Sequence, residues 1–255
     1  AGADRPLVHP QDQRADFWHG SDGLGGRAGM LPEPTGPLSP RGAVALLADL
    51  LLSVPAPVTL VPIGPLTNIA LLLAAHPYVK PQIHRIVAMG GTLSEGNTGD
   101  TGSGSGSVAE FNIHSDPEAA RRVLVEEDVP TTLVPLDLTL RAAVDSAWLH
   151  ELAAAGPRCA ALAGVVEHCR ERFHKTTGRD AVPLHDSLAV LEAALPGTLE
   201  TTVLPLEVVC DHGPARGAIR TDDARGTENH QVHVALDGDL PTINATILDR
   251  LRGLR

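Results

Sequence analysis

Residues 83–89, IHRIVAM, lead into a glycine pair and a long polar stretch that closes with VAEFNIHSDPEAA at residues 108–120. The apolar, β-branched run predicts a buried strand, and the two glycines that follow predict its end. Asp116 and Pro117 then suit the N-cap and the first position of a helix. Polar residues just beyond the end of such a strand lie where open α/β sheets bind their ligands.

Three polar residues of this stretch, Asn97, Glu110 and Asn112, are expected in the loop between the strand and the helix. A glutamate flanked by two asparagines offers acceptors and donors suited to a polyhydroxylated small molecule. The same residue types are common in solvated connections, and their spacing alone favours that interpretation over a binding site. The Gly/Ser run at residues 98–106 predicts that part of the loop is mobile.

The rest of the chain alternates between helical periodicity and short apolar runs. This alternation predicts the α/β class, with a mostly parallel open sheet and flanking helices. No internal repeat or domain boundary is evident, so residues 1–255 are expected to form a single domain. The expected helices span residues 41–53, 67–77, 146–155, 158–173 and 242–251, and the expected strands span residues 58–62, 131–135, 201–210 and 231–235.

The amino-acid composition argues against several classes of binding partner. The chain has 255 residues, of which 43% are hydrophobic, enough for a sizeable core. A net charge of −11 and an aromatic content of 2% argue against nucleic acid or an anionic membrane as partner. The three cysteines show no CxxC spacing, which disfavours a disulfide framework or zinc site and favours a reducing compartment. With no signal peptide and no long apolar run, we expect a cytoplasmic protein.

Several motifs together resemble one enzyme family. The order MGG…GN…VAEFNI…DPEAA, with GPLTNIA at residues 64–70 and PLHDSLAV at residues 183–190, is similar to the inosine-uridine-preferring nucleoside hydrolases. The likeness runs from residue 1 to near the C-terminus. It implies hydrolysis of the N-glycosidic bond of ribonucleosides to ribose and a free base, with Ca²⁺ as cofactor. It also leads us to expect a homo-oligomer, and it leaves the choice between purine and pyrimidine open.

The same resemblance assigns the sugar contacts. Asn97, Glu110 and Asn112 match the family residues that hold the ribose hydroxyls, and Met89 matches one that packs against the sugar. His19, in the glycine loop HGSDGLGG, matches a candidate contact to the base. A plain loop histidine is the competing interpretation of His19, and the spacing favours it slightly.

His185 and Asp186 form the second constellation. By resemblance, Asp186 is a Ca²⁺ ligand, Ile63 gives its backbone carbonyl to the same ion, and His185 donates a proton to the leaving base. Both roles make chemical sense, because Ca²⁺ prefers oxygen ligands and histidine titrates near neutrality. The competing interpretation makes Asp186 the N-cap of a helix and His185 its solvated neighbour.

The chain departs from the family pattern at an important point. The family opens with an aspartate cluster, DxDxGxDD, that supplies further Ca²⁺ ligands, the base that activates water and a ribose contact, and these 255 residues contain no such cluster. We therefore expect a nucleoside hydrolase-like fold truncated at its N-terminus, with weak metal binding and doubtful activity. The alternative function is a catalytically inactive homologue or a nucleoside- or ribose-binding protein.

Overall fold

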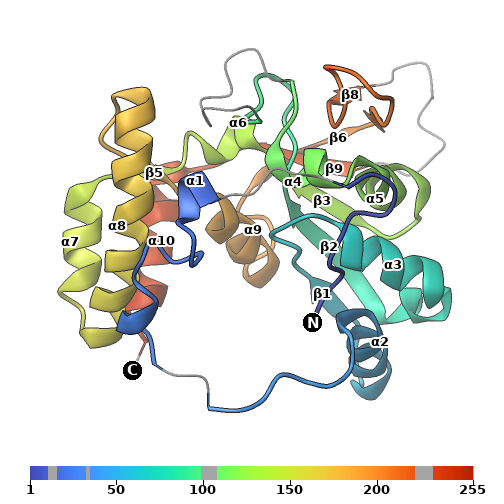
Figure 1. The fold of residues 1–255 in the computed structure, drawn as a ribbon, viewed down its shortest axis with the longest axis horizontal. Helices are drawn as coiled ribbons and strands as arrows, with labels where there is room; N and C mark the ends of the chain where they lie inside the picture. Colours follow the sequence, from blue (N-terminus) through green and yellow to red (C-terminus); the bar gives the residue numbers. More distant parts are fainter. Residues whose placement is uncertain (11–15, 33–34, 99–107, 222–231, 255) are drawn as a thin grey trace.

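The computed structural model describes residues 1–10, 16–32, 35–98, 108–221 and 232–254. Within these residues, one central sheet has the strand order β1-β2-β3-β9-β6 (Figure 1). Its strands are β1 Val58–Leu60, β2 Ile83–Met89, β3 Thr131–Val134, β9 Val232–Asp237 and β6 Glu200–Leu204. The first four strands are parallel and β6 is antiparallel to β9, which confirms the mostly parallel α/β sheet.

Successive side chains of a strand point to opposite faces of the sheet, and each face packs into a separate hydrophobic core. On β2, Ile86 and Ala88 belong to the core shared with α2, α3 and α5, whereas Val87 and Met89 belong to the core shared with α9 and α10. Both faces are apolar because each is covered by helices, as in parallel sheets generally. The bounds of these helices are α2 Ala43–Ser53, α3 Thr67–Ala75, α5 Pro117–Arg121, α9 His185–Ala194 and α10 Leu240–Arg252.

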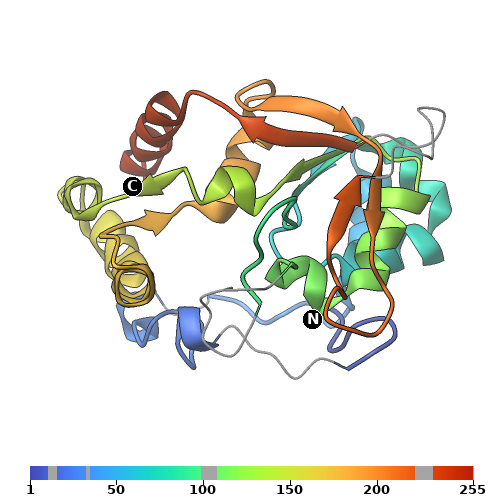
Figure 2. The same ribbon diagram turned by 90° about the horizontal axis from the view of Figure 1, so that it is seen from above.

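A further group of helices lies beside the sheet layer (Figures 1 and 2). Helix α7 (Ser146–Ala153) packs against α8 (Pro157–Thr177), and both contact α10 through a small core that includes Leu152, Cys159 and Leu248. Short elements complete the description: α1 Asp16–His19, η1 Ala28–Met30, η2 Pro77–Gln82, α4 Phe111–Ser115, η3 Arg122–Glu126, α6 Leu136–Thr139, β4 Ala143–Val144, β5 Val182–Pro183, β7 Leu206–Val208 and β8 Ile219–Thr221.

Three local expectations need correction or qualification. The strand expected over residues 201–210 is two strands in different sheets, because Pro205 lacks the N–H that would continue the ladder. Asp186 is not an N-cap: α9 begins at His185, its N-cap residue is Leu184, and no side chain caps it. The Gly/Ser run that was expected to be mobile lies almost entirely in residues 99–107, outside the described residues.

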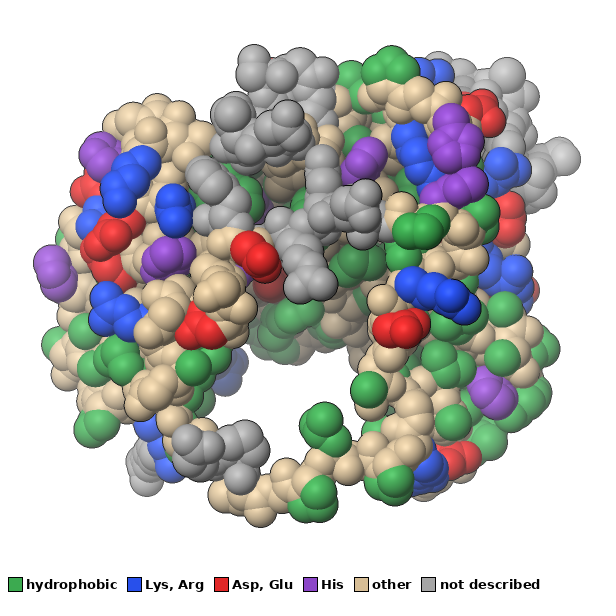
Figure 3. All heavy atoms as spheres, in the orientation of Figure 1, with side chains coloured by type: hydrophobic (Ala, Val, Ile, Leu, Met, Phe, Trp, Pro, Cys, Tyr) green, Lys and Arg blue, Asp and Glu red, His purple; other side chains and the backbone are tan. Residues whose placement is uncertain are grey.

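An opening separates the α7–α8 side of the molecule from the α2–α3 side, and the residues directly before α2 lie along its border (Figure 3). Across the described ranges, no helix is both long enough and apolar enough to cross a membrane.

Candidate functional site

The carboxyl ends of β1, β2 and β3 meet at the start of the polar stretch. The N–H of Met89 donates to the carbonyl of Pro62 at 3.0 Å, and the N–H of Gly90 donates to that of Val134 at 3.2 Å. Met89 is 4% exposed. Gly91 has a φ of +76°, a conformation that glycine adopts without steric cost, and the chain turns away from the sheet there. This edge is where an open parallel sheet binds ligands.

Glu110 and Asn112 are not in a loop, as the sequence suggested, but at the start of the short helix α4. The Glu110 carboxylate caps this helix by accepting the N–H groups of Asn112 at 2.8 Å and Ile113 at 3.1 Å. It also accepts the N–H of Gly91 at 2.8 Å. A capping carboxylate is favourable there because the first N–H groups of a helix have no partner within it. Glu110 is thereby fixed against the end of β2.

Asn97 and Asn112 reach the same place from different parts of the chain. The side-chain oxygen of Asn97 accepts the N–H of Phe111 at 2.8 Å, and the Asn97 N–H donates to the carbonyl of Ala109 at 3.1 Å. The side-chain amide of Asn112 donates to the carbonyl of Met89 at 3.2 Å. The structure therefore brings Met89, Asn97, Glu110 and Asn112 together.

Two carboxyl groups of the site have raised pKa values. Burial raises the pKa of Glu110 to about 7, against the opposing effect of its three backbone hydrogen bonds, and the charge of Asp186 raises it slightly further. Burial of its inner side raises the pKa of Asp186 to about 6, although the residue as a whole is exposed to solvent. Helix α9 packs against β2, and the charge of Asp186 in its first turn acts on Glu110.

His185 and His19 also lie on this side of the molecule. Nδ1 of His185 is 2.7 Å from the hydroxyl of Thr139 on α6. Burial lowers the pKa of His185 to about 4, and the charge of His19 lowers it further, so the imidazole is neutral at pH 7. The pKa of His19 is lowered by burial and by His168, and its Nδ1 lies 3.8 Å from Sγ of Cys169. His19 thus contacts α8, on which α1 packs, and its charge acts on His185.

Sequence reasoning missed two supporting side chains. Thr139 holds His185, and Asp137 accepts hydrogen bonds from the Leu93 N–H at 2.9 Å and the Ser94 hydroxyl at 2.6 Å, which fixes the chain after β2 onto α6. Asp137 lies shortly after a predicted strand, and this position indicates a residue near a ligand site. The contact of Thr139 with a histidine 46 positions away has no local signature.

The described residues do not make a calcium site. Asp186 offers one carboxylate and Ile63 one backbone carbonyl, whereas Ca²⁺ takes six to eight oxygen ligands. Among the residues that the structure describes, no group of three His, Cys, Asp or Glu side chains is placed to hold a metal ion. Asp22, an acidic residue of the glycine loop, uses its carboxylate to accept the N–H groups of Leu24 and Gly26.

Comparisons with known proteins converge on one family. A family model described as inosine-uridine preferring nucleoside hydrolase matches residues 1–244. The pyrimidine-specific ribonucleoside hydrolase RihA of Salmonella arizonae is 38% identical over 208 residues, which cover 79% of this chain and 63% of that protein. An uncharacterized protein of Schizosaccharomyces pombe is 33% identical over 264 residues, covering 100% of this chain and 77% of its own length.

Solved structures agree with these sequence matches. A purine-preferring ribonucleoside hydrolase from Gardnerella vaginalis superposes with a TM-score of 0.87 at 26% identity, over 99% of this chain and 79% of that one. An inosine-guanosine nucleoside hydrolase gives a TM-score of 0.78 at 26% identity, over 98% and 78% of the two chains. The chain thus spans somewhat less than two thirds of the Salmonella relative and about four fifths of the solved structures.

Proposed function

The chain belongs to the inosine-uridine preferring nucleoside hydrolase family, and from that premise we propose that its protein hydrolyses the N-glycosidic bond of ribonucleosides to ribose and a free base. The observation that carries the proposal is the cluster of Met89, Asn97, Glu110 and Asn112 at the carboxyl end of β2. The family model and the hydrolase relatives favour a hydrolase over a non-catalytic binding protein. The proposal treats residues 1–255 as one nucleoside hydrolase-like domain.

Glu110 and Asn112 would recognise the ribose. An ionised carboxylate has about four acceptor positions, and Glu110 uses three of them for backbone N–H groups, so it can still accept a ribose hydroxyl. With a pKa raised to about 7, Glu110 has both its ionised and its protonated form available near neutral pH. The ionised form, with Asp186 nearby, would stabilise the positive charge that develops on the sugar as the bond to the base breaks.

His185 would face the leaving base and donate a proton to it. Thr139 occupies Nδ1 of His185, which leaves Nε2 as the nitrogen that can approach a base. A pKa of about 4 is low for a proton donor at neutral pH, so this role requires the pKa to rise when the substrate binds. The anionic groups of the site, Glu110 and Asp186, would favour such a rise. His19 completes the proposed base contacts.

Calcium is part of the proposal on the grounds of family alone. Asp186 and the carbonyl of Ile63 would supply two ligands, and the described residues do not supply the others, so no chemical step is assigned to the ion. The proposal also includes a cytoplasmic homo-oligomer that acts on free nucleosides, with neither nucleic acid nor a membrane as partner. Whether purine or pyrimidine nucleosides are preferred is left to the assay.

The experiment compares two leaving groups in the protein expressed from its complete reading frame. His185→Ala should slow hydrolysis of inosine about a hundredfold or more and that of a nitrophenyl riboside far less, because an activated leaving group needs no proton. Val190→Ala, at an exposed position of α9, is the matched control. Equal losses on the two substrates would remove His185 from the donor role. A wild-type protein that releases no ribose from inosine or uridine would contradict the proposed function itself.

A further inference from the structure

A small antiparallel hairpin, residues 206–221 and called here the β7–β8 hairpin, lies against the residues proposed to hold ribose. Ala218 of the hairpin forms an isolated antiparallel bridge with Ala109, the residue before Glu110. Ile219 packs onto Gly91 so closely that a methyl group at Gly91 would lie 2.4 Å from its Cδ1. The hairpin therefore touches both chain segments that the Glu110 carboxylate ties together.

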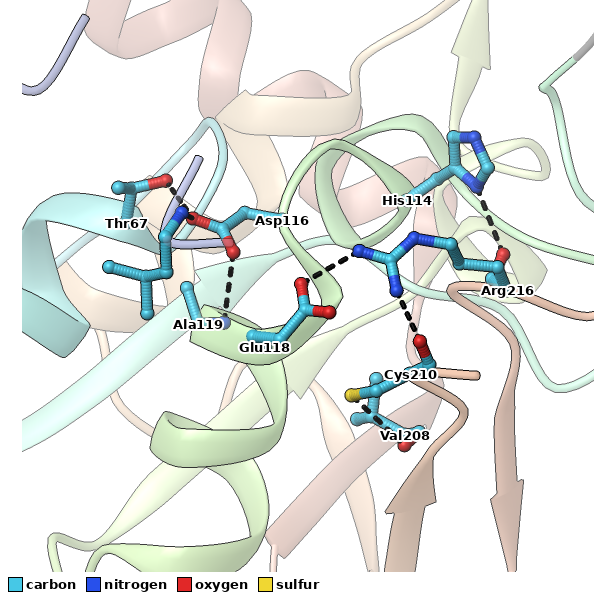
Figure 4. Close-up of polar contacts among 9 residues, drawn as sticks. Thr67, His114, Asp116, Glu118, Ala119, Val208, Cys210 and Arg216 are labelled. Atoms are coloured by element: carbon cyan, nitrogen blue, oxygen red, sulfur yellow. Dashed lines mark hydrogen bonds and ion pairs between the residues drawn. The ribbon is translucent and has the colours of Figure 1, made fainter. Parts of the chain in front are cut away.

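Arg216, at the turn of this hairpin, connects it to two helices (Figure 4). One guanidinium nitrogen of Arg216 donates to the Glu118 carboxylate on α5 at 2.8 Å, and the other donates to the carbonyl of Cys210. The backbone carbonyl of Arg216 accepts a hydrogen bond from Nδ1 of His114 on α4 at 2.9 Å. A carbonyl can only accept, so Nδ1 of His114 carries the hydrogen.

The Arg216–Glu118 pair is sheltered from solvent. The two side chains are 13% and 20% exposed, so the pair is screened less than a surface ion pair. Next to it, Gly217 has a φ of +82°, and a Cβ there would lie 2.7 Å from Cα of His114. The turn of the hairpin therefore fits directly against α4, and His114 is only two residues beyond Asn112.

From this geometry we propose that Arg216 is a positioning residue for ribose recognition. Its guanidinium ties the β7–β8 hairpin to Glu118 of α5, which keeps the backbone of the hairpin turn against His114 of α4 and so fixes the orientation of Glu110 and Asn112. The catalytic part of this inference rests on the proposed function. The structural part is independent of the proposed function, because the stability of the hydrogen bonds that Glu110 accepts can be measured without substrate. The guanidinium acts at a distance, and Arg216 is assigned no contact with substrate.

The first experiment measures amide hydrogen exchange in the protein expressed from its complete reading frame. In Arg216→Ala, the hairpin loses its ion pair with α5, so its turn should hold α4 less firmly. The amides of Asn112 and Ile113 should then exchange about tenfold faster, because α4 opens locally more often. The amide of Val87, in the middle of the sheet, should not change. Glu118→Gln tests the same ion pair from the other side, and Arg220→Ala, an exposed arginine of the same hairpin, is the matched control. Unchanged exchange at Asn112 and Ile113 in a folded variant would overturn the inference, with or without activity.

The second experiment separates positioning from general weakening of the fold. Arg216→Ala should lower kcat/KM for a ribonucleoside about tenfold relative to the 3′-deoxynucleoside, because only the former depends on the oriented hydroxyl contacts. Arg216→Lys, which can keep one of the two hydrogen bonds, should restore part of that ratio. Equal losses on the two substrates would show that Arg216 is merely structural and would overturn the inference. If the wild-type protein is inactive, that result contradicts the proposed function. The hydrogen-exchange result then decides by itself whether Arg216 positions Glu110 and Asn112.

Discussion

Replacing Glu110 with glutamine should change how the free energy of unfolding depends on pH. Glu110 is 2% exposed, and its carboxylate accepts the N–H groups of Gly91, Asn112 and Ile113. Glutamine has nearly the same shape, but it cannot ionise. It also turns one acceptor oxygen into an NH₂ group that faces an N–H, which should cost about 1–3 kcal/mol at any pH.

The size of this pH effect on the free energy of unfolding follows from the raised pKa of Glu110. Burial moves the pKa of Glu110 from its ordinary value of 4.5 to about 7 in the folded protein. Between these values the folded state holds a proton that the unfolded state has lost, so the free energy of unfolding falls as the pH rises through this window. One pKa unit corresponds to about 1.4 kcal/mol, so the wild-type protein should lose about 2.5 kcal/mol between pH 5 and pH 8 from this group. The glutamine variant should not show this loss.

Urea unfolding at several pH values between 5 and 8 measures the difference directly. Asp186 and His185 also titrate in this range, but both proteins contain them, so their contributions largely cancel in the comparison. Glu200→Gln, at an exposed position of β6, is the matched control and should follow the wild-type curve. If the curves of wild type and Glu110→Gln run parallel, the buried carboxyl does not have the raised pKa from which this argument starts.

Three more predictions concern the fold and the metal. Asp116→Asn should lower the free energy of unfolding by about 2–4 kcal/mol in a thermal or urea melt, because the fully buried carboxylate accepts the Leu7 N–H at 2.9 Å and the Thr67 hydroxyl at 2.6 Å (Figure 4). Gly91→Ala should cost about 1–3 kcal/mol in the same melt, because the new methyl group overlaps Ile219 and the residue has a positive φ. Gly23→Ala, with a φ of +72° and open space around it, should cost only about 1 kcal/mol. Equal costs for the two variants would contradict the overlap at Gly91. Residues 1–255 expressed alone, with excess Ca²⁺, should release no reducing sugar from inosine or uridine, because the described residues offer too few metal ligands. Turnover that a chelator abolishes would contradict this expectation.

Local patterns were enough to predict the architecture. The strand over Ile83–Met89 has the predicted bounds, because its β-branched apolar run and the glycines after it are features of neighbouring residues. Asp116 and Pro117 take the predicted N-cap and first helical positions of α5 for the same reason. The resemblance of several ordered motifs then identified the family, which the comparisons confirm. The residues proposed as ribose contacts could be selected in this way, although not their arrangement.

That arrangement depends on packing between segments far apart in the chain. Asn97 meets the helix that Glu110 caps because Glu110 is bound to Gly91 at the sheet edge and Ala109 to the β7–β8 hairpin, and no local pattern encodes that meeting. The pKa values of Glu110 and His185 follow from burial, which is a property of the assembled fold and not of residue type. Propensity and periodicity report on residues a few positions apart, whereas burial and contacts across a hundred positions exist only after the elements have packed.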